Sequence, residues 1–283
     1  PNSQIMGRPW FERIILNLGL KIILEESLGM DNKPDILCIS FSAMDWMIHD
    51  YGPFSQEVMD ACIKLDKYIG VFINELDKLI GLEHIEFIFT SDHGGLPLPE
   101  FQQKNGIQAG RINPDELLEA YEWIEDEITE EYDKDLFVRD GINYYFDLET
   151  LKKRNIPLSK LQNIVKKYLP KVVGIEKVFT KKDILEGDST DKIIYRLQNM
   201  VHKEKSPDAI SIVSPGYLFR NPHGTSHGSP YDYDTHVPLL FSKKGRKKKS
   251  VLDATETVDI APTIARILGI NHLAKYDGKP LDF

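Results

Sequence analysis

The feature that most constrains the fold of this chain is a pair of short apolar runs separated by one long amphipathic segment. Residues 36–41 (ILCISF) and 86–91 (EFIFTS) are apolar runs of the kind that form strands buried on both faces of a sheet. Between them, Ser55 is placed to cap a helix that extends to about Leu79, and Gly81 ends it. A strand, a helix and a strand in this order form a βαβ unit. The sequence therefore predicts an α/β fold with a mainly parallel sheet flanked by helices.

Composition narrows the class of protein. The chain has 283 residues, of which 41% are hydrophobic and 28% charged, as in globular proteins that bury a core. The formal net charge is −9, whereas a general nucleic-acid binder needs a basic face, so no nucleic-acid-binding surface is expected. No apolar run approaches the length of a membrane span. A short basic run at 245–249 is typical of a solvated loop.

The first residues and the cysteines carry two further expectations. Residues 1–4 (PNSQ) show neither a signal-peptide pattern nor an initiator Met, so the chain is expected to be a piece of something longer. Cys38 and Cys62 are too few for a disulfide framework. Both lie in apolar segments, where a free cysteine usually acts as a small buried hydrophobe.

The sequence pattern changes between about Pro97 and Asp208, where charges of both signs are dense. We expect residues 1–96 and 207–283 to form the α/β core, and residues 97–206 to form an inserted α+β cap. Within the cap, the patterns predict helices at 114–132 and 158–169 and strands at 143–146 and 172–179. After it, they predict strands at 210–213, 217–219 and 237–241 and a helix at 257–268.

Polar residues follow both strands of the predicted βαβ unit, where open α/β sheets collect their chemistry. After the first strand, Asp45 and His49 are four residues apart, so on a helix they share one face and can bind one ion. By itself, this spacing is more typical of a surface ion pair. After the second strand, Asp92 and His93 are adjacent and are followed by two glycines, which permit an irregular backbone.

A third candidate ligand is His227, which lies in a glycine-flanked loop (HGTSHG, residues 223–228). Carboxylates and imidazoles at two strand ends, joined by a loop histidine, are the ligands that borderline divalent ions such as Zn²⁺ take. The set formed with Asp45, His49, Asp92 and His93 exceeds one tetrahedral site. Two ions sharing a phosphoryl group are therefore the natural hypothesis.

These residues lie in motifs whose order and spacing resemble those of a known family. The motifs are S-x-x-D-x-x-x-H-x-x-G-P at 42–53, TSDHG at 90–94, GTSHG at 224–228, DIAPT at 259–263 and DGKPL at 277–281. Together they resemble the alkaline phosphatase superfamily, in particular the type I phosphodiesterase/nucleotide pyrophosphatase group. Within that group, SFS at 40–42, PEF at 99–101 and AGR at 109–111 are most similar to the periplasmic, monoester-hydrolysing alkaline phosphatases.

The resemblance implies an alkaline-phosphatase-like core and a phosphoric ester hydrolase. It implies that one zinc is held by Asp45, His49 and His227, and a second by Asp92, His93 and further ligands absent from this chain. A second-shell position is implied for His236, and each ligating imidazole needs an acceptor for its other nitrogen. The implied substrate is a small phosphate ester or a nucleotide.

The sequence departs from the family pattern at two places. Family members commonly have Gly before the helix-borne metal histidine, whereas this chain has Ile48. The family's Thr or Ser nucleophile has no counterpart before Asp45, so no catalytic nucleophile is assigned. We therefore expect a fragment that lacks the nucleophile, whose partner is its own N-terminal half. By the same resemblance, the expected location is periplasmic or extracytoplasmic.

Two alternatives stay open at this point. A cofactor-independent phosphoglycerate or phosphosugar mutase of the same superfamily also carries an Asp…His pair and an Asp-His-Gly motif. The PEF and AGR segments favour the hydrolase. A non-catalytic metal-binding domain that kept its ligands and lost the nucleophile is the other alternative.

Overall fold

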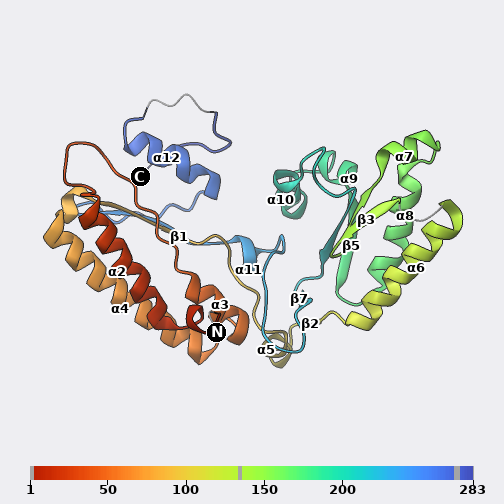
Figure 1. Ribbon diagram of the computed structural model, residues 1–283, viewed down its shortest axis with the longest axis horizontal. Helices are drawn as coiled ribbons and strands as arrows, with labels where there is room; N and C mark the ends of the chain where they lie inside the picture. The colour runs from red at the N-terminus through yellow and green to blue at the C-terminus, as the bar shows by residue number, and fades with distance from the viewer. Residues whose placement is uncertain (1–2, 133–135, 271–274, 283) are drawn as a thin grey trace. The chain divides into compact units, whose positions relative to one another are not determined.

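A computed structural model describes residues 3–132, 136–270 and 275–282 (Figure 1). Contacts between residues divide the chain into two compact units. The first unit comprises residues Pro1–Glu12, Phe41–Leu65 and Thr90–Leu239. The second unit comprises Arg13–Ser40, Asp66–Phe89 and Leu240–Phe283. All the sequence-predicted metal ligands fall in the first unit.

Helix α3 and the start of α4, which both lie in the first unit, form a small apolar contact that orients the predicted ligands. Helix α3 (Ser42–Tyr51) buries Ala43 and Met47, and Met47 packs against Val58 and Ala61 at the start of α4 (Gln56–Leu79). The Val58 N–H donates to Ser55 Oγ at 3.2 Å, which confirms the predicted N-cap of α4. Because residues two positions apart on a helix point in nearly opposite directions, this packing leaves the other face of α3 to its polar residues.

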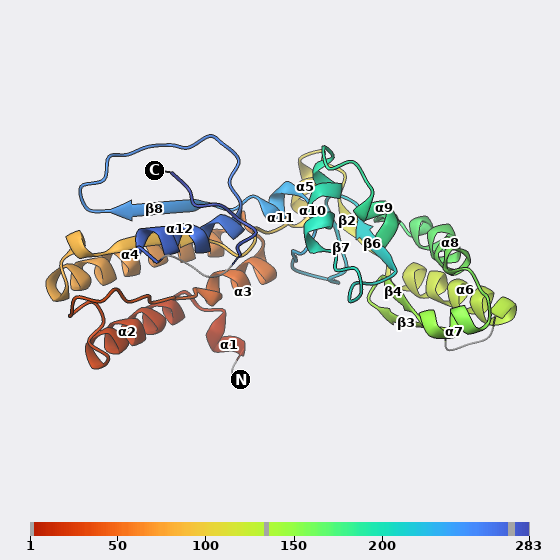
Figure 2. The same ribbon diagram turned by 90° about the horizontal axis from the view of Figure 1, so that it is seen from above.

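The first unit also contains a four-stranded antiparallel sheet in the order β3-β4-β6-β5. Figure 2 labels its strands β3, β4 and β6. The strands are β3 (Phe137–Asp140), β4 (Asn143–Phe146), β5 (Ile175–Thr180) and β6 (Ala209–Val213). The sheet therefore includes a strand that follows residue 206. The division of the chain into a core and a cap at residues 97 and 206 stays a prediction.

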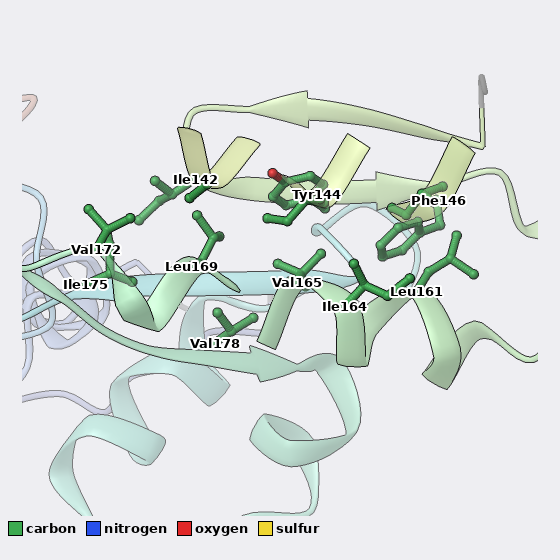
Figure 3. Packing of buried hydrophobic residues seen from close by; sticks show 14 of the residues in the cluster. Ile142, Tyr144, Phe146, Leu161, Ile164, Val165, Leu169, Val172, Ile175 and Val178 are labelled. Atoms are coloured by element: carbon green, nitrogen blue, oxygen red, sulfur yellow. The ribbon is translucent and has the colours of Figure 1, made fainter. Parts of the chain in front are cut away.

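An apolar core lies between this sheet and the helices α6 (Pro114–Tyr132) and α8 (Leu158–Tyr168). In Figure 3, Leu161 and Val165 of α8 point toward β4, where Tyr144 and Phe146 lie. Leu161 and Val165 are fully shielded from solvent, and Tyr144 is 1% exposed. Burying each such aliphatic side chain contributes about 1.5–3 kcal/mol, so this core is the main source of stability in the unit. We call the sheet with α6 and α8 the sheet region.

Short elements complete the first unit. β2 (Gly110–Arg111) and β7 (Tyr217–Leu218) pair in parallel. The others are α1 (Ser3–Met6), α5 (Pro99–Lys104), α7 (Leu148–Lys153), η2 (Leu169–Lys171), α9 (Lys181–Leu185), α10 (Lys192–Met200) and α11 (Asp232–Thr235).

The second unit contains most of α2 (Pro9–Glu25) and of α4, and a two-stranded sheet of β1 (Glu86–Thr90) and β8 (Leu239–Lys243). A Cβ at Gly19 of α2 would lie 3.1 Å from the Ile39 side chain and 3.5 Å from that of Phe72, so the glycine allows close packing onto α4. The remaining elements are η1 (Leu82–His84), η3 (Thr257–Asp259) and α12 (Ile260–Ile267). No described helix is both long enough and apolar enough to cross a bilayer.

The DIAPT and DGKPL motifs meet within the second unit. Buried Asp259 accepts the Lys279 N–H at 2.8 Å, and the hydroxyl of fully buried Thr263 accepts the Leu281 N–H at 2.9 Å. A Cβ at Gly278 would lie 2.3 Å from the Val258 carbonyl oxygen, so only glycine fits there. These motifs tie the polypeptide after α12 to the start of that helix.

Two expectations are wrong, namely the strand at 36–41 and the burial of the two cysteines. Residues 36–41 form no strand, and Ile36 is 58% exposed, because a strand requires a neighbouring strand and none of the described residues pairs with this segment. Cys38 is consequently exposed, and Cys62 of α4 is exposed as well. The strand predicted at 86–91 is confirmed as β1, and the helix predicted at 114–132 is confirmed as α6.

Candidate metal centre

Helix α3 carries two of the predicted ligands. Asp45 and His49 lie on the face opposite buried Ala43 and Met47, one helical turn apart. The His49 Nε2 atom is 3.5 Å from Asp45 Oδ1. The predicted sharing of one face is therefore confirmed, and it follows from the helical spacing together with the apolar anchor beneath.

Asp92 and His93 lie in the segment that follows β1, and the backbone of this segment is irregular. The Gly94 N–H donates to the Asp234 carbonyl at 2.7 Å, and the Gly95 N–H donates to the Tyr233 carbonyl at 3.0 Å. A Cβ at Gly94 would lie 2.1 Å from the Tyr233 carbonyl oxygen, so this approach requires glycine.

Ile48, the residue that departs from the family pattern, is accommodated by Gly95. Its Cγ2 atom lies 3.0 Å from where a Cβ of Gly95 would be. It also packs against the cluster formed by Met47, Val58 and Ala61. The bulkier side chain therefore fills apolar space and leaves His49 on the polar face.

The loop that carries His227 is fixed to both other segments through Thr225, which is fully buried. The Thr225 N–H donates to the His49 carbonyl at 2.8 Å, and the Thr225 hydroxyl donates to the Leu96 carbonyl at 2.7 Å. The three ligand-bearing segments are thus joined by hydrogen bonds that involve the main chain.

Two of the histidines have the acceptor that a ligating imidazole needs. His49 Nδ1 is 2.8 Å from the Thr225 carbonyl, and His93 Nδ1 is 2.8 Å from the Gly94 carbonyl. Because a carbonyl only accepts, each Nδ1 must carry the proton in these contacts. The Nε2 lone pair of each ring is then free to bind a metal ion.

The Nε2 atoms of three histidines converge on one carboxylate oxygen. Asp45 Oδ1 is 3.5 Å from His49 Nε2, 3.6 Å from His227 Nε2 and 3.9 Å from His93 Nε2. The ligand atoms of Asp45, His49 and His227 all lie within 4.8 Å of one another. Two ligand atoms of a tetrahedral zinc ion are about 3.3 Å apart. The separations of Asp45 Oδ1 from the Nε2 atoms of His49 and His227 are close to that value.

Electrostatics at the cluster favour neutral imidazole at His227. Burial, and next the neighbouring His93, hold the pKa of His227 below its ordinary value, against the opposing pull of Asp45. The rings of His93 and His227 are stacked with centroids 3.4 Å apart. A neutral imidazole keeps the lone pair that a metal ion requires.

The other predicted site residues lie farther out. The Asp92 carboxylate is 3.5 Å from His93 Nε2, but its side chain is 86% exposed. His236 lies at the end of α11 and is exposed, and its ring forms no hydrogen bond with any residue that the structure describes. Its assignment to the second shell stays a prediction, as do the individual roles of the five ligands.

Sequence reasoning missed the groups that orient the ligands. The carbonyls of Thr225 and Gly94 give no sequence signal, because every residue carries one. Asp234 is buried, and its Oδ2 accepts from the N–H and the hydroxyl of Ser229 at 2.8 and 2.6 Å. It fixes the turn that follows His227, and nothing in its local sequence distinguishes it from a surface aspartate.

Comparisons with known proteins give consistent results. A family model described as type I phosphodiesterase / nucleotide pyrophosphatase matches residues 9–237. Alkaline phosphatase PafA of Elizabethkingia meningoseptica is 28% identical over 280 residues, which cover 98% of this chain and 50% of that protein. Alkaline phosphatase PhoV of Synechococcus elongatus is 28% identical over 278 residues, with the same coverage. The chain therefore spans about half the length of the curated relatives it matches.

A solved structure supports the same similarity. The crystal structure of wild-type alkaline phosphatase PafA superposes with a TM-score of 0.87 and 25% sequence identity. The superposition covers 99% of this chain and 53% of that one.

Proposed function

The chain belongs to the type I phosphodiesterase/nucleotide pyrophosphatase family, and from this premise we propose that it is the metal-binding part of a hydrolase of phosphate esters. The observation that carries the proposal is the convergence of three Nε2 atoms on Asp45 Oδ1. The predicted α/β, alkaline-phosphatase-like fold is confirmed by the structural match. Its substrates are proposed to be small phosphate esters or nucleotides.

In this proposal Asp45, His49 and His227 hold one zinc ion, and Asp92 and His93 contribute to a second. When bound, the ions supply positive charge that polarises the phosphoryl group and stabilises the attacking and leaving oxygens. The second site has only two ligands from this chain, and one of them is largely exposed. It should therefore bind zinc more weakly than the first.

The chain's own residues prepare the site before any ion binds. The Thr225 and Gly94 carbonyls hold the protons of His49 and His93 on Nδ1, so that both Nε2 atoms face the cluster as acceptors. The site therefore needs little rearrangement of its first ligands.

No hydroxyl beside the ligands is offered as the nucleophile. The Ser91 hydroxyl donates to the His93 carbonyl at 2.6 Å, and the Thr90 hydroxyl lies 3.4 Å from the Ser91 carbonyl. We propose that the nucleophile and the remaining ligands of the second zinc site come from an N-terminal half that completes this fold. The relatives are about twice as long as this chain, and the β1–β8 sheet exposes Phe89 and Leu240 where such a polypeptide could pack.

The test is hydrolysis of nitrophenyl phosphate and the matching diester by the chain with zinc, alone and together with a separately produced N-terminal half from one of the relatives. We expect zinc binding by the chain alone, and turnover only when the second polypeptide is present. Substituting His227→Ala should abolish both. Zinc binding without turnover in any combination would favour the non-catalytic metal-binding domain, and turnover by the chain alone would show that the nucleophile lies within it.

A periplasmic or extracytoplasmic location is proposed as well. It is supported by the PEF and AGR segments, which resemble those of periplasmic monoesterases. Fractionation of the source cells, followed by antibody detection of the chain, tests it. Recovery with cytoplasmic markers would contradict the proposal.

A further inference from the structure

An arginine outside the ligand set binds the end of α3 and the His227 loop at the same time. The Arg220 Nη1 atom donates to the His49 carbonyl at 2.9 Å and to the Thr225 carbonyl at 3.3 Å. Its Nη2 atom donates to Asp50 Oδ1 at 2.7 Å. One guanidinium therefore contacts the main chain of a proposed ligand and the loop that carries another.

The His49 carbonyl depends on these donors because the helix supplies none. The N–H that would reach it belongs to the residue four positions later, which is Pro53 and has no N–H. The Thr225 N–H and Arg220 take its place. A positive charge is also favoured at this position, because the C-terminal end of a helix carries partial negative charge.

The same guanidinium acts on the His49 imidazole through a shared acceptor. The Thr225 carbonyl that accepts from Arg220 is also the acceptor of His49 Nδ1 at 2.8 Å. A Cβ at Gly224 would lie 2.4 Å from the His49 carbonyl oxygen and 2.9 Å from the Arg220 Cζ atom, so only glycine permits this approach. The position of the imidazole is thus coupled to that of Arg220.

A second arginine, Arg111, holds the main chain of Arg220 and Gly224 in place. Its Nη1 donates to the Arg220 carbonyl at 2.6 Å, its Nη2 donates to the Gly224 carbonyl at 2.9 Å, and its Nε pairs with Glu100 Oε1 at 2.7 Å. Glu100 of the PEF segment and Arg111 of the AGR segment therefore help to hold Arg220 and the loop before His227 in place.

We propose that Arg220 is a positioning residue of the metal centre, which orients His49 and the His227 loop so that their Nε2 atoms meet at Asp45. This inference rests on the proposed function, since it concerns the same site. Losing a residue that orients metal ligands typically weakens metal affinity 10- to 100-fold, and we expect a loss in this range for Arg220→Ala.

The experiment measures zinc affinity of the 283-residue chain by competition with a chelating dye, and records the visible spectrum of the cobalt(II)-loaded chain. The variants are Arg220→Ala, Arg220→Lys and, as a matched control, Arg196→Ala. Arg196 also donates to one carbonyl, Pro230, and to one carboxylate, Asp232, but contacts neither His49 nor Thr225. Thermal unfolding of the metal-free variants reports on folding separately.

We expect Arg220→Ala to lose affinity and to change the cobalt spectrum, and Arg220→Lys to recover part of both, while Arg196→Ala binds like the parent chain. An Arg220→Ala variant that folds and binds zinc as the parent does overturns the inference and leaves the proposed function intact. If Arg220→Ala does not fold, Arg220→Lys decides, and unchanged affinity and spectrum overturn the inference. A parent chain that binds no zinc overturns the proposed function together with it.

Discussion

The sheet region and the candidate metal centre lie in the same compact unit but are held together by different forces. In the sheet region, side chains such as Ile124, Leu161 and Val165 are completely shielded from solvent. At the metal centre, the side chains of Asp45, His49 and His227 are between 23% and 40% exposed, and hydrogen bonds to main-chain atoms hold their segments in place. Stability and ligand geometry therefore rest on different residues, and substitutions should affect them separately.

The largest expected effect is in the sheet region. Substituting Leu161→Ala should lower the free energy of unfolding by about 2–5 kcal/mol, because a fully buried side chain is removed and leaves a cavity. Urea denaturation followed by circular dichroism measures it, and zinc affinity of the folded variant should be unchanged. The surface substitution Leu148→Ala is the control, since Leu148 is half exposed. A large fall in zinc affinity of folded Leu161→Ala would show that the two regions are coupled.

At the metal centre, the sensitive feature is the path of the backbone. Substituting Gly94→Ala should destabilise the chain by about 1–3 kcal/mol and weaken zinc binding, because the new Cβ would clash with the Tyr233 carbonyl and displace His93. Gly70→Ala is the control, because open space surrounds that glycine in α4 and alanine favours a helix. Titration calorimetry with zinc, together with thermal unfolding, compares the two. Parent-like zinc binding by Gly94→Ala would contradict the interpretation.

A smaller effect is expected from the buried hydroxyl of Thr225. Substituting Thr225→Val removes the hydrogen bond to the Leu96 carbonyl with almost no change in shape and should cost about 1 kcal/mol. The Thr225 carbonyl is retained, so the acceptor of His49 Nδ1 persists and zinc affinity should fall only slightly. Chemical denaturation and chelator competition give the two numbers, and a loss of affinity larger than the loss of stability would argue against this separation.

The smallest expected effect is a dependence on pH at Glu12, which is 2% exposed and accepts the Ala43 N–H at the start of α3. Burial raises the pKa of Glu12 above its ordinary value, although hydrogen bonds from Ala43 and Met44 oppose the shift. The folded state therefore favours the neutral carboxyl. The corresponding stabilisation is complete below the pKa in the unfolded chain and is lost as the pH rises through the pKa in the folded chain.

Substituting Glu12→Gln removes this titration. We expect the stability of the variant relative to the parent chain to increase between acidic and neutral pH. Denaturation midpoints at several pH values measure the difference. If the difference in stability between the variant and the parent chain does not change with pH, the pKa of Glu12 is not raised in the folded chain.

The parts of the fold and of the site that could be predicted are those that a local sequence pattern marks. Asp45, His49, Asp92, His93 and His227 were predicted as metal ligands because their residue types and motif spacing are typical of such ligands. Helix α6 was found because Pro114 and the acidic residues after it are typical of a helix start. Both signals are local in the sequence.

The features that were missed depend on partners far away in the chain. Residues 36–41 have the composition of a buried strand, but a strand is defined by a neighbour that the segment itself does not encode. The contact between Arg220 and the His49 carbonyl joins positions 171 residues apart, and no local pattern marks either of them. The carbonyl acceptors of His49 and His93 are invisible to any analysis of side chains.

Those carbonyl acceptors make the orientation of the imidazoles tolerant of side-chain substitution. A histidine oriented by a neighbouring side chain loses its support when that side chain mutates, whereas the Thr225 and Gly94 carbonyls survive any substitution that preserves the backbone path. Substitutions that keep the loop's course should therefore leave both imidazoles oriented, whereas a side chain at Gly94 or Gly224 should disturb them.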